Sequence, residues 1–378
     1  MTTKQTALPA RRFDLSGLAA TLLNSAAAIV VALAVGAIFI IISGDNPFVA
    51  YRALLEGAFV GRRAIAETLV ASVPMILGGL AFAVAARAGM FNIGIEGQLV
   101  MGGLVGGIVG AAAWDLPGIV YIPIILLSGA IAGGLWAAIA GLLKARSGAS
   151  EVITTIMLNY IAFRISTYVL TTGGDRLSMI DTVQQATKRV PADARLPIVL
   201  ERTRLHAGII VALGAAIILW YILFRTTFGY QIRTVGLSHG AAAFAGIKWG
   251  RTVVLAMFAS GFLGGLTGVV EANGLHGRYS DTSAGYGFTA IAVGLVGRNH
   301  PLGVIAAGLL FGILRNGANG MQNEAGTSKE LVLILQGLVI LSISALAAFE
   351  TVRDRRRRRA EMPPPTTFTE SVTQGAPV

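Results

Sequence analysis

Long runs of apolar residues, separated by short polar or glycine-rich segments, dominate the pattern along this chain. Runs of about 17 to 25 apolar residues are long enough to cross the hydrocarbon core of a membrane as helices. The pattern predicts ten such segments, at 22–43, 65–86, 93–113, 119–143, 152–171, 206–224, 252–272, 286–297, 301–318 and 331–350. The eighth is too short to cross as a regular helix, so we expect it to be broken or re-entrant. The chain is therefore predicted to be an all-α polytopic membrane protein with about ten transmembrane helices.

The composition supports this interpretation and excludes several others. Apolar residues make up 54% of the 378 residues and charged residues only 13%, whereas a soluble domain carries roughly 25% charged residues. A soluble enzyme, a disordered hub and a nucleic-acid-binding domain are thereby excluded as descriptions of the whole chain. Glycine is frequent, and pairs such as Gly129–Gly133, Gly261–Gly265 and Gly308–Gly312 are expected to pack helices closely. Because the chain has no cysteine, disulfides and Cys-ligated metals are excluded as well.

The distribution of basic residues indicates how the chain is oriented. The block Arg355–Arg359 directly follows the last apolar run. We interpret it as a cytoplasmic stop signal that binds anionic lipid heads, and not nucleic acid. Both termini are then cytoplasmic, which requires an even number of spans. We expect a cytoplasmic segment at 1–21, a transmembrane domain at 22–350 and a basic, proline-containing, disordered cytoplasmic tail at 351–378.

Two hydrophilic segments stand out between the apolar runs. Residues 172–205 are predicted to face outward, either as a simple connector or as a docking or gating loop. Residues 225–251 are predicted to face the cytoplasm. In this second segment glycines flank the short helical stretch AAAFAG, which we expect to lie as a small helix across the membrane face.

The sequence motifs of catalysis are missing. The chain has no G-x-x-x-x-G-K-[ST] loop for ATP, no H-E-x-x-H and no G-x-S-x-G. Its four histidines are scattered without metal-ligand spacing. We therefore expect neither an enzyme nor a cofactor or metal held by this chain.

Polar residues interrupt two of the apolar runs. In the first interruption, at 86–107, glycines alternate with Asn92, Glu96 and Gln98. Irregular backbone at membrane depth is tolerated where it lines a cavity, and a carboxylate there is a functional candidate. Glu96 could instead sit at a helix end or pair structurally with an arginine, so both interpretations stay open.

The second interruption, at 271–301, also leads into a glycine-spaced apolar segment. The two interruptions have opposite predicted orientations, which suggests an inverted repeat with a substrate path between its halves. In the span at 152–171, Asn159 and Tyr160 either line that path or hold helices together.

Several of these segments resemble a known family. FNIGIEGQ at 91–98, SEVITTIMLNYIA at 150–162 and GYGFTAIAVGLVGRNHPLGVIAAGLLFG at 285–312 are similar to permease subunits of bacterial ABC importers. The group concerned serves nucleosides and simple sugars, within the branched-chain amino acid and ribose permease family. FGYQIRTVGLSHGAAAFAGI at 228–247 resembles the cytoplasmic loop that presses a coupling helix into the ATPase subunit. The resemblance covers about 20–350.

The resemblance implies that this chain is one subunit of a larger transporter complex. It implies two permease subunits, with a heterodimer favoured over a homodimer, in the bacterial inner membrane. It also implies cytoplasmic ATPase subunits, which hold the ATP and Mg, and an extracytoplasmic substrate-binding protein. The form NIGIEGQ differs from the G-I-D-L-S-V-G of ribose-type permeases, which favours nucleosides over simple sugars and leaves both open.

Two sets of site residues follow from these patterns. The substrate path is expected to include Phe91, Asn92, Glu96, Gln98, Asn159, Tyr160 and Phe288. The coupling segment is expected to include Gly236, Gly240, Ala241, Ala242, Ala243, Phe244, Ala245 and Gly246. Its small side chains would seat deeply in a groove of the ATPase, its glycines would permit sharp turns, and Phe244 would be the one large anchor. A competing hypothesis is an ion- or proton-coupled carrier in which Glu96 titrates.

Overall fold

The structure is a computed structural model that describes residues 30–173, 178–280, 285–328, 330–342 and 345. Six helices are long and apolar enough to cross a membrane. They are α3 (Arg62–Arg87), α5 (Gly118–Ser147), α6 (Glu151–Thr172), α7 (Gly208–Arg225), α10 (Trp249–Val270) and α12 (Pro301–Ala325). Three shorter apolar helices accompany them: α4 (Ile95–Ala111), α11 (Tyr286–Val296) and a helix at Glu330–Ser342. The expectation of an all-α membrane protein is therefore confirmed.

A helix lies at each of the ten predicted apolar runs, although 22–29, 343–344 and 346–350 fall outside the described residues. Helix α11 is short, as expected: its 11 residues span about 16 Å, or roughly half of a hydrocarbon core of about 30 Å. A helix at Val30–Ile42 and α2 (Pro47–Phe59) together form one more candidate span, bent by 119°. Which of these helices cross a membrane stays a prediction.

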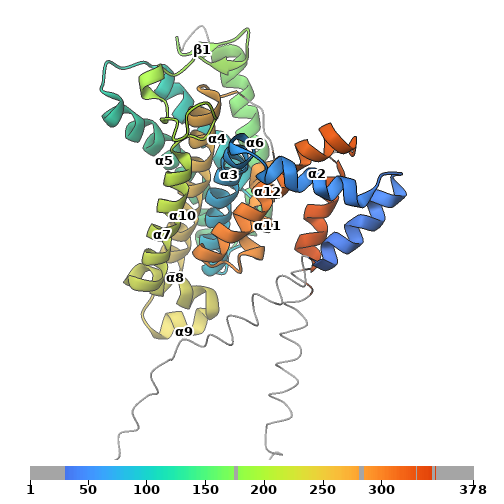
Figure 1. The fold of residues 1–378 in the computed structure, drawn as a ribbon. Coiled ribbons are helices and arrows are strands. Elements are labelled where there is room, and N and C mark those ends of the chain that lie inside the picture. Colours follow the sequence, from blue (N-terminus) through green and yellow to red (C-terminus); the bar gives the residue numbers. More distant parts are fainter. Residues whose placement is uncertain (1–29, 174–177, 281–284, 329, 343–344, 346–378) are drawn as a thin grey trace, which may run out of the picture.

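Helix α2 was not predicted, because the charged residues Arg52 and Glu56 interrupt its apolar sequence. Asn46 caps its first turn by accepting a hydrogen bond from the Phe48 amide at 2.9 Å, and Pro47 occupies the first helical position. Arg52 and Glu56, four residues apart on its surface, form an ion pair at 2.7 Å. Its apolar face packs with Val30–Ile42, α12 and Glu330–Ser342 into a separate small core beside the main bundle (Figure 1).

Glycines bring α10 into direct backbone contact with its neighbours α4 and α5. A methyl group placed on Gly133 would lie 2.5 Å from the Cα of Gly265, and one on Gly102 would overlap the backbone of Gly265. Gly268 packs in the same way against the carbonyl of Leu99. The expected packing role of the glycine pairs is therefore confirmed in this seam.

The two ends of the bundle carry different structures (Figure 1). At one end, strands β1 (Ile180–Asp181) and β2 (Ala186–Thr187) form an antiparallel hairpin, followed by the 3₁₀ helix η2 (Ala192–Ala194). At the other end lie α8 (Thr227–Leu237) and α9 (His239–Phe244). The hydrophilic segments at 172–205 and 225–251 thus lie at opposite ends, as the predicted orientation requires.

The segment that carries the hairpin is bound tightly to the residues that follow α10. The Thr187 amide donates to the carbonyl of Tyr279 at 2.8 Å. The Asn273 side chain accepts from the Leu196 amide at 2.7 Å and donates to the Ala194 carbonyl at 3.0 Å. This segment is consequently an ordered cap over the second interruption.

The glycine seam generates a prediction about stability. Replacing Gly265 by valine should destabilise the bundle by about 1–3 kcal/mol or more, because the branched side chain must displace the backbone of α4 or α5. Gly214 is the matched control, since it lies in α7 with nothing within 4 Å of an added methyl group. Gly214→Val should melt like the unaltered protein in detergent. Equal melting temperatures for both variants would contradict the seam.

Candidate functional site

The first interruption is held together by amide side chains. The chain leaves the helix after Arg87, passes Gly89 in the left-handed conformation (φ 75°) and becomes helical again at Ile95. The amides of Asn92 and Gln98 bond each other reciprocally at 3.1 Å. Asn92 also donates to Ser260 on α10 at 2.8 Å and accepts from the Gly94 amide at 2.8 Å. Side chains therefore satisfy polar groups that would otherwise be left unpaired away from water.

Asn159 ties helix α6 to the same interruption. Its amide oxygen accepts a hydrogen bond from the Gly97 amide at 2.8 Å, and its amide nitrogen donates to the Ile93 carbonyl at 3.0 Å. Asn159 is buried, whereas its neighbour Tyr160 is 65% exposed on the outside of the helix. Of the two roles considered for Asn159, the structure gives it the helix-holding contacts.

Glu96 lies at the N-terminus of α11, within the second interruption. Its Oε2 accepts a hydrogen bond from the Gly287 amide at 2.5 Å, and the side chain is buried. The N-terminal end of a helix carries a partial positive charge and free amide groups, which favour a carboxylate. Gly287 has no room for a side chain, because an added methyl group would lie 2.6 Å from Glu96 Oε2. The carboxylate is thus partnered by a helix end from the other interruption.

The predicted path residues divide into two groups in the structure. Asn92, Glu96, Gln98 and Asn159 are buried and frame the first interruption. Phe91, Tyr160 and Phe288 are exposed on the surface of the chain. The ring of Phe91 packs edge-on against Phe82 at 5.2 Å between centroids.

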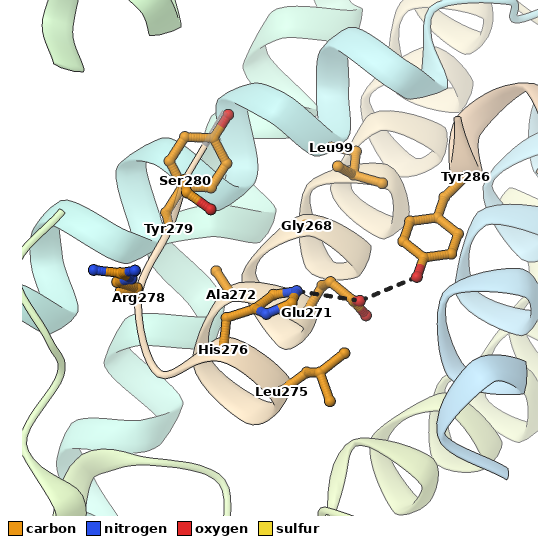
Figure 2. A pocket seen from close by; sticks show the side chains of 10 residues that line it. All are labelled: Leu99, Gly268, Glu271, Ala272, Leu275, His276, Arg278, Tyr279, Ser280 and Tyr286. Carbon is orange, nitrogen blue, oxygen red and sulfur yellow. Dashed lines mark hydrogen bonds and ion pairs between the residues drawn. The ribbon is translucent and has the colours of Figure 1, made fainter. Parts of the chain in front are cut away.

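A pocket of about 260 Å³ opens beside the second interruption, and Figure 2 shows its lining. After α10 the helix continues as a π-helical turn, η3 (Glu271–His276), which is a rare geometry common at functional sites. Glu271 Oε1 accepts from the Tyr286 hydroxyl at 3.2 Å and lies 3.8 Å from His276 Nε2. The guanidinium of Arg315 lies 4.3 Å from the centre of the Tyr286 ring.

Sequence reasoning missed the pocket around Glu271. The one available signal was a carboxylate at the end of an apolar run, which is a functional candidate by default. Its partners come from η3, α11 and α12, so the sequence offered no spacing that would group them.

A second carboxylate near this end of the bundle is already ion-paired. Arg204 binds Glu67 through two nitrogens, at 2.8 Å and 2.6 Å. The hydrogen bond that Arg204 donates to Glu67 raises the pKa of the Arg204 guanidinium above its usual range. Arg204 is therefore held by Glu67, in the two-pronged geometry that suits arginine and a carboxylate.

The coupling segment differs from its prediction in three ways. Residues 227–237 form a helix that was not expected, and Gly236 and Gly240 lie inside helices and not in turns. The chain turns instead at Ser238, whose hydroxyl caps α9 by accepting from the Ala241 amide at 3.2 Å. Only Gly246 of the predicted glycines has the left-handed conformation, at φ 70°. Ala242 is fully buried within the chain, while Phe244 is 99% exposed.

Helix α8 contacts the first interruption directly. A methyl group on Gly236 would overlap the carbonyl of Arg87 and lie 2.9 Å from the Gly89 amide. The guanidinium groups of Arg233 and Arg87 lie 5.2 Å and 5.7 Å from the Phe224 ring centre. Arg87 also donates to the carbonyl of Asn299, between α11 and α12, at 2.8 Å. The segment at 225–251 is thus packed against both interrupted regions.

The ring of His300 lies 5.1 Å from Phe224 in the same cluster. Burial and, secondarily, the neighbouring Arg87 lower the pKa of His300 below its usual value. The histidine therefore adds no positive charge to the two arginines at neutral pH. Among the described residues, no group of three or more histidine, aspartate or glutamate side chains could hold a metal ion.

Residues 64–344 match the family described as the branched-chain amino acid transport system / permease component. The chain is 38% identical to the guanosine ABC transporter permease protein NupP of Bacillus subtilis, over 88% of this chain and 95% of that protein. It is 36% identical to the nucleoside ABC transporter permease protein NupB of Lactococcus lactis, over 86% and 91%. A glucose ABC transporter permease of Haloferax volcanii is 33% identical, over 86% and 87%. No solved structure matches the chain.

The contact between Glu96 and α11 generates a graded prediction. Glu96→Ala should lower stability by about 1–3 kcal/mol, because the buried Gly287 amide loses its acceptor. Glu96→Gln should cost less, since glutamine keeps an oxygen that can accept the same bond. Thermal unfolding of the purified chain would measure both, with Glu56→Ala on the exposed face of α2 as the control. Equal stability of the alanine variant and the unaltered chain would contradict a capping role.

Proposed function

The chain belongs to the branched-chain amino acid transport system / permease component family, and we propose that it imports nucleosides as the permease subunit of an ABC importer. The observation that carries the proposed substrate is the 38% identity to a guanosine permease over nearly the full length of both proteins. A simple sugar is the second candidate, which the glucose permease of Haloferax volcanii supports.

In this proposal the permease itself catalyses no covalent reaction. ATP and Mg bind to separate cytoplasmic ATPase subunits, and an extracytoplasmic binding protein delivers the solute. The permease pairs with a second, related permease in the inner membrane, as the resemblance implies. The cap at the hairpin end offers the binding protein a polar surface, on which Gln184, Gln185 and Lys188 are exposed.

We place the substrate path at the interruptions. The buried amides of Asn92, Gln98 and Asn159, together with Glu96, hold irregular backbone in place beside the path. The exposed aromatic residues Phe91, Tyr160 and Phe288 supply its surface. The first interruption packs against α8, and the start of the second is bound to the hairpin segment at the other end of the bundle. We propose two inverted halves, ten spans and cytoplasmic termini.

Helix α9 is the proposed contact with the ATPase. Apolar residues are exposed on it, Phe244 above all, at the end of the bundle opposite the hairpin (Figure 1). A large aromatic side chain on such a surface is the usual centre of an interface. Movement of α9 would pass to α8, whose Gly236 touches the first interruption at Arg87 and Gly89.

Uptake by whole cells tests the function. Cells that carry the complete importer should accumulate labelled guanosine, and uptake should stop when the ATPase subunit loses its phosphate-binding lysine. Collapse of the membrane potential at constant cellular ATP should leave uptake intact. Uptake that survives loss of the ATPase and depends on the potential would support the ion-coupled carrier instead.

Coupling is tested by Phe244→Ala. This variant should fold normally, because the ring is 99% exposed and contributes little to the core of the chain. It should no longer co-purify with the ATPase subunit, and its uptake rate should fall by at least about tenfold, as expected for the central residue of an interface. Phe48→Ala is the matched control, since Phe48 is 87% exposed and belongs to α2, which lies away from α9 (Figure 1). Normal assembly and uptake of Phe244→Ala would remove α9 as the coupling helix.

A further inference from the structure

The pocket around Glu271 is lined by none of the predicted path residues. It is formed where η3 ends α10 and where α11 begins, under the cap that carries the hairpin. The Glu271 side chain is 13% exposed, so the carboxylate is sheltered yet open to the pocket. We propose that this pocket binds the ribose of an imported nucleoside, with Glu271 as the acceptor for its vicinal hydroxyls. The inference rests on the proposed function.

The carboxylate is oriented by groups on one of its oxygens. Tyr286 donates to Oε1, and His276 approaches the same atom. Among the residues that the structure describes, none hydrogen-bonds Oε2. Figure 2 shows Glu271 between His276 and Tyr286, with Arg278 pointing away from it. A carboxylate with one tethered oxygen and one free oxygen is suited to accept hydroxyl groups, as acidic residues do for ribose in dinucleotide-binding folds.

Within the part of the chain that the structure describes, no arginine forms a direct ion pair with Glu271. Arg204 already binds both oxygens of Glu67. Arg315 stacks on the Tyr286 ring, which fixes the ring that supplies the hydroxyl to Glu271. A carboxylate in a membrane span is costly, so its retention without such an ion pair indicates a role in binding.

The size and walls of the pocket limit what it can hold. Its volume of about 260 Å³ is below the roughly 300–1,000 Å³ of sites that enclose drug-sized ligands. Leu99, Ala272 and Leu275 form apolar walls next to Glu271, which is the one carboxylate among the described residues of the lining. One ring with hydroxyl groups on one edge and carbon atoms on its faces fits this chemistry, and a ribose is such a ring.

The test compares a ribonucleoside with its deoxy form. Cells with the complete importer would be given labelled guanosine or 2′-deoxyguanosine, and the ratio of the two initial uptake rates would be measured. The unaltered importer should prefer guanosine. Glu271→Gln should lower that ratio by about tenfold, because the hydrogen bond to a charged acceptor is lost. The binding protein is the same in both strains, so a changed ratio belongs to this chain.

Two further variants keep the result interpretable. Tyr286→Phe removes the hydroxyl that orients the carboxylate and should lower the ratio by about threefold, even if Glu271→Gln fails to insert. Glu56→Gln, in the exposed ion pair on α2, should leave the ratio unchanged. Membrane levels of each variant would be measured in parallel.

The outcomes separate this inference from the function on which it rests. An unaltered importer that takes up neither nucleoside overturns the proposed function and the inference together. Uptake without preference in the unaltered importer overturns the inference alone. So does an unchanged ratio in an inserted Glu271→Gln or Tyr286→Phe variant, including a loss that is equal for both nucleosides.

Discussion

The absence of water from the membrane interior is the constraint on which the rest of this structure depends. Every backbone group that leaves a helix there needs a partner from the protein. In the first interruption these partners are the side chains of Asn92 and Asn159, and Gln98 and Ser260 hold Asn92 in place. Glu96 then joins this region to the second interruption by binding the Gly287 amide at the start of α11. The two irregular regions are consequently one connected polar unit inside the bundle.

Such a unit can form only if the helices around it approach closely. Gly102, Gly133 and Gly265 let the backbones of α4, α5 and α10 touch, which positions Ser260 and Gln98 within reach of Asn92. Small residues serve the same purpose generally in membranes, where lipid is as apolar as a leucine side chain and offers no drive for association. Glycine packing and polar bonding therefore depend on each other. The glycines set a short distance between the helices, and at this distance the polar side chains can form hydrogen bonds.

The parts of the fold that could be predicted are those with a local signal. Apolar length alone located the main helices, and glycines among polar residues located both interruptions, because each property belongs to a continuous stretch of chain. Helix α2 escaped notice because Arg52 and Glu56 break its apolar pattern, although they pair with each other. The partners of Glu96 and Glu271 could not be foreseen from local sequence. Gly287 lies 191 residues from Glu96, and Tyr286 lies 15 residues from Glu271. The burial of Ala242 likewise depends on which face of α9 packs against the rest of the chain, and the alanine-rich sequence does not indicate that face.

The contact of Gly236 with Arg87 and Gly89 also limits how this chain can vary over evolution. Neither partner has space to spare, because a single added methyl group on Gly236 meets main-chain atoms that cannot rotate aside. A side chain at position 236 would accordingly require the backbone around 87–89 to move, although almost 150 positions of sequence separate the two segments. A hybrid that received segment 225–251 from a relative would contain only one of the two surfaces that meet at this contact. It would also need the donor's residues around 87–89, which form the other surface.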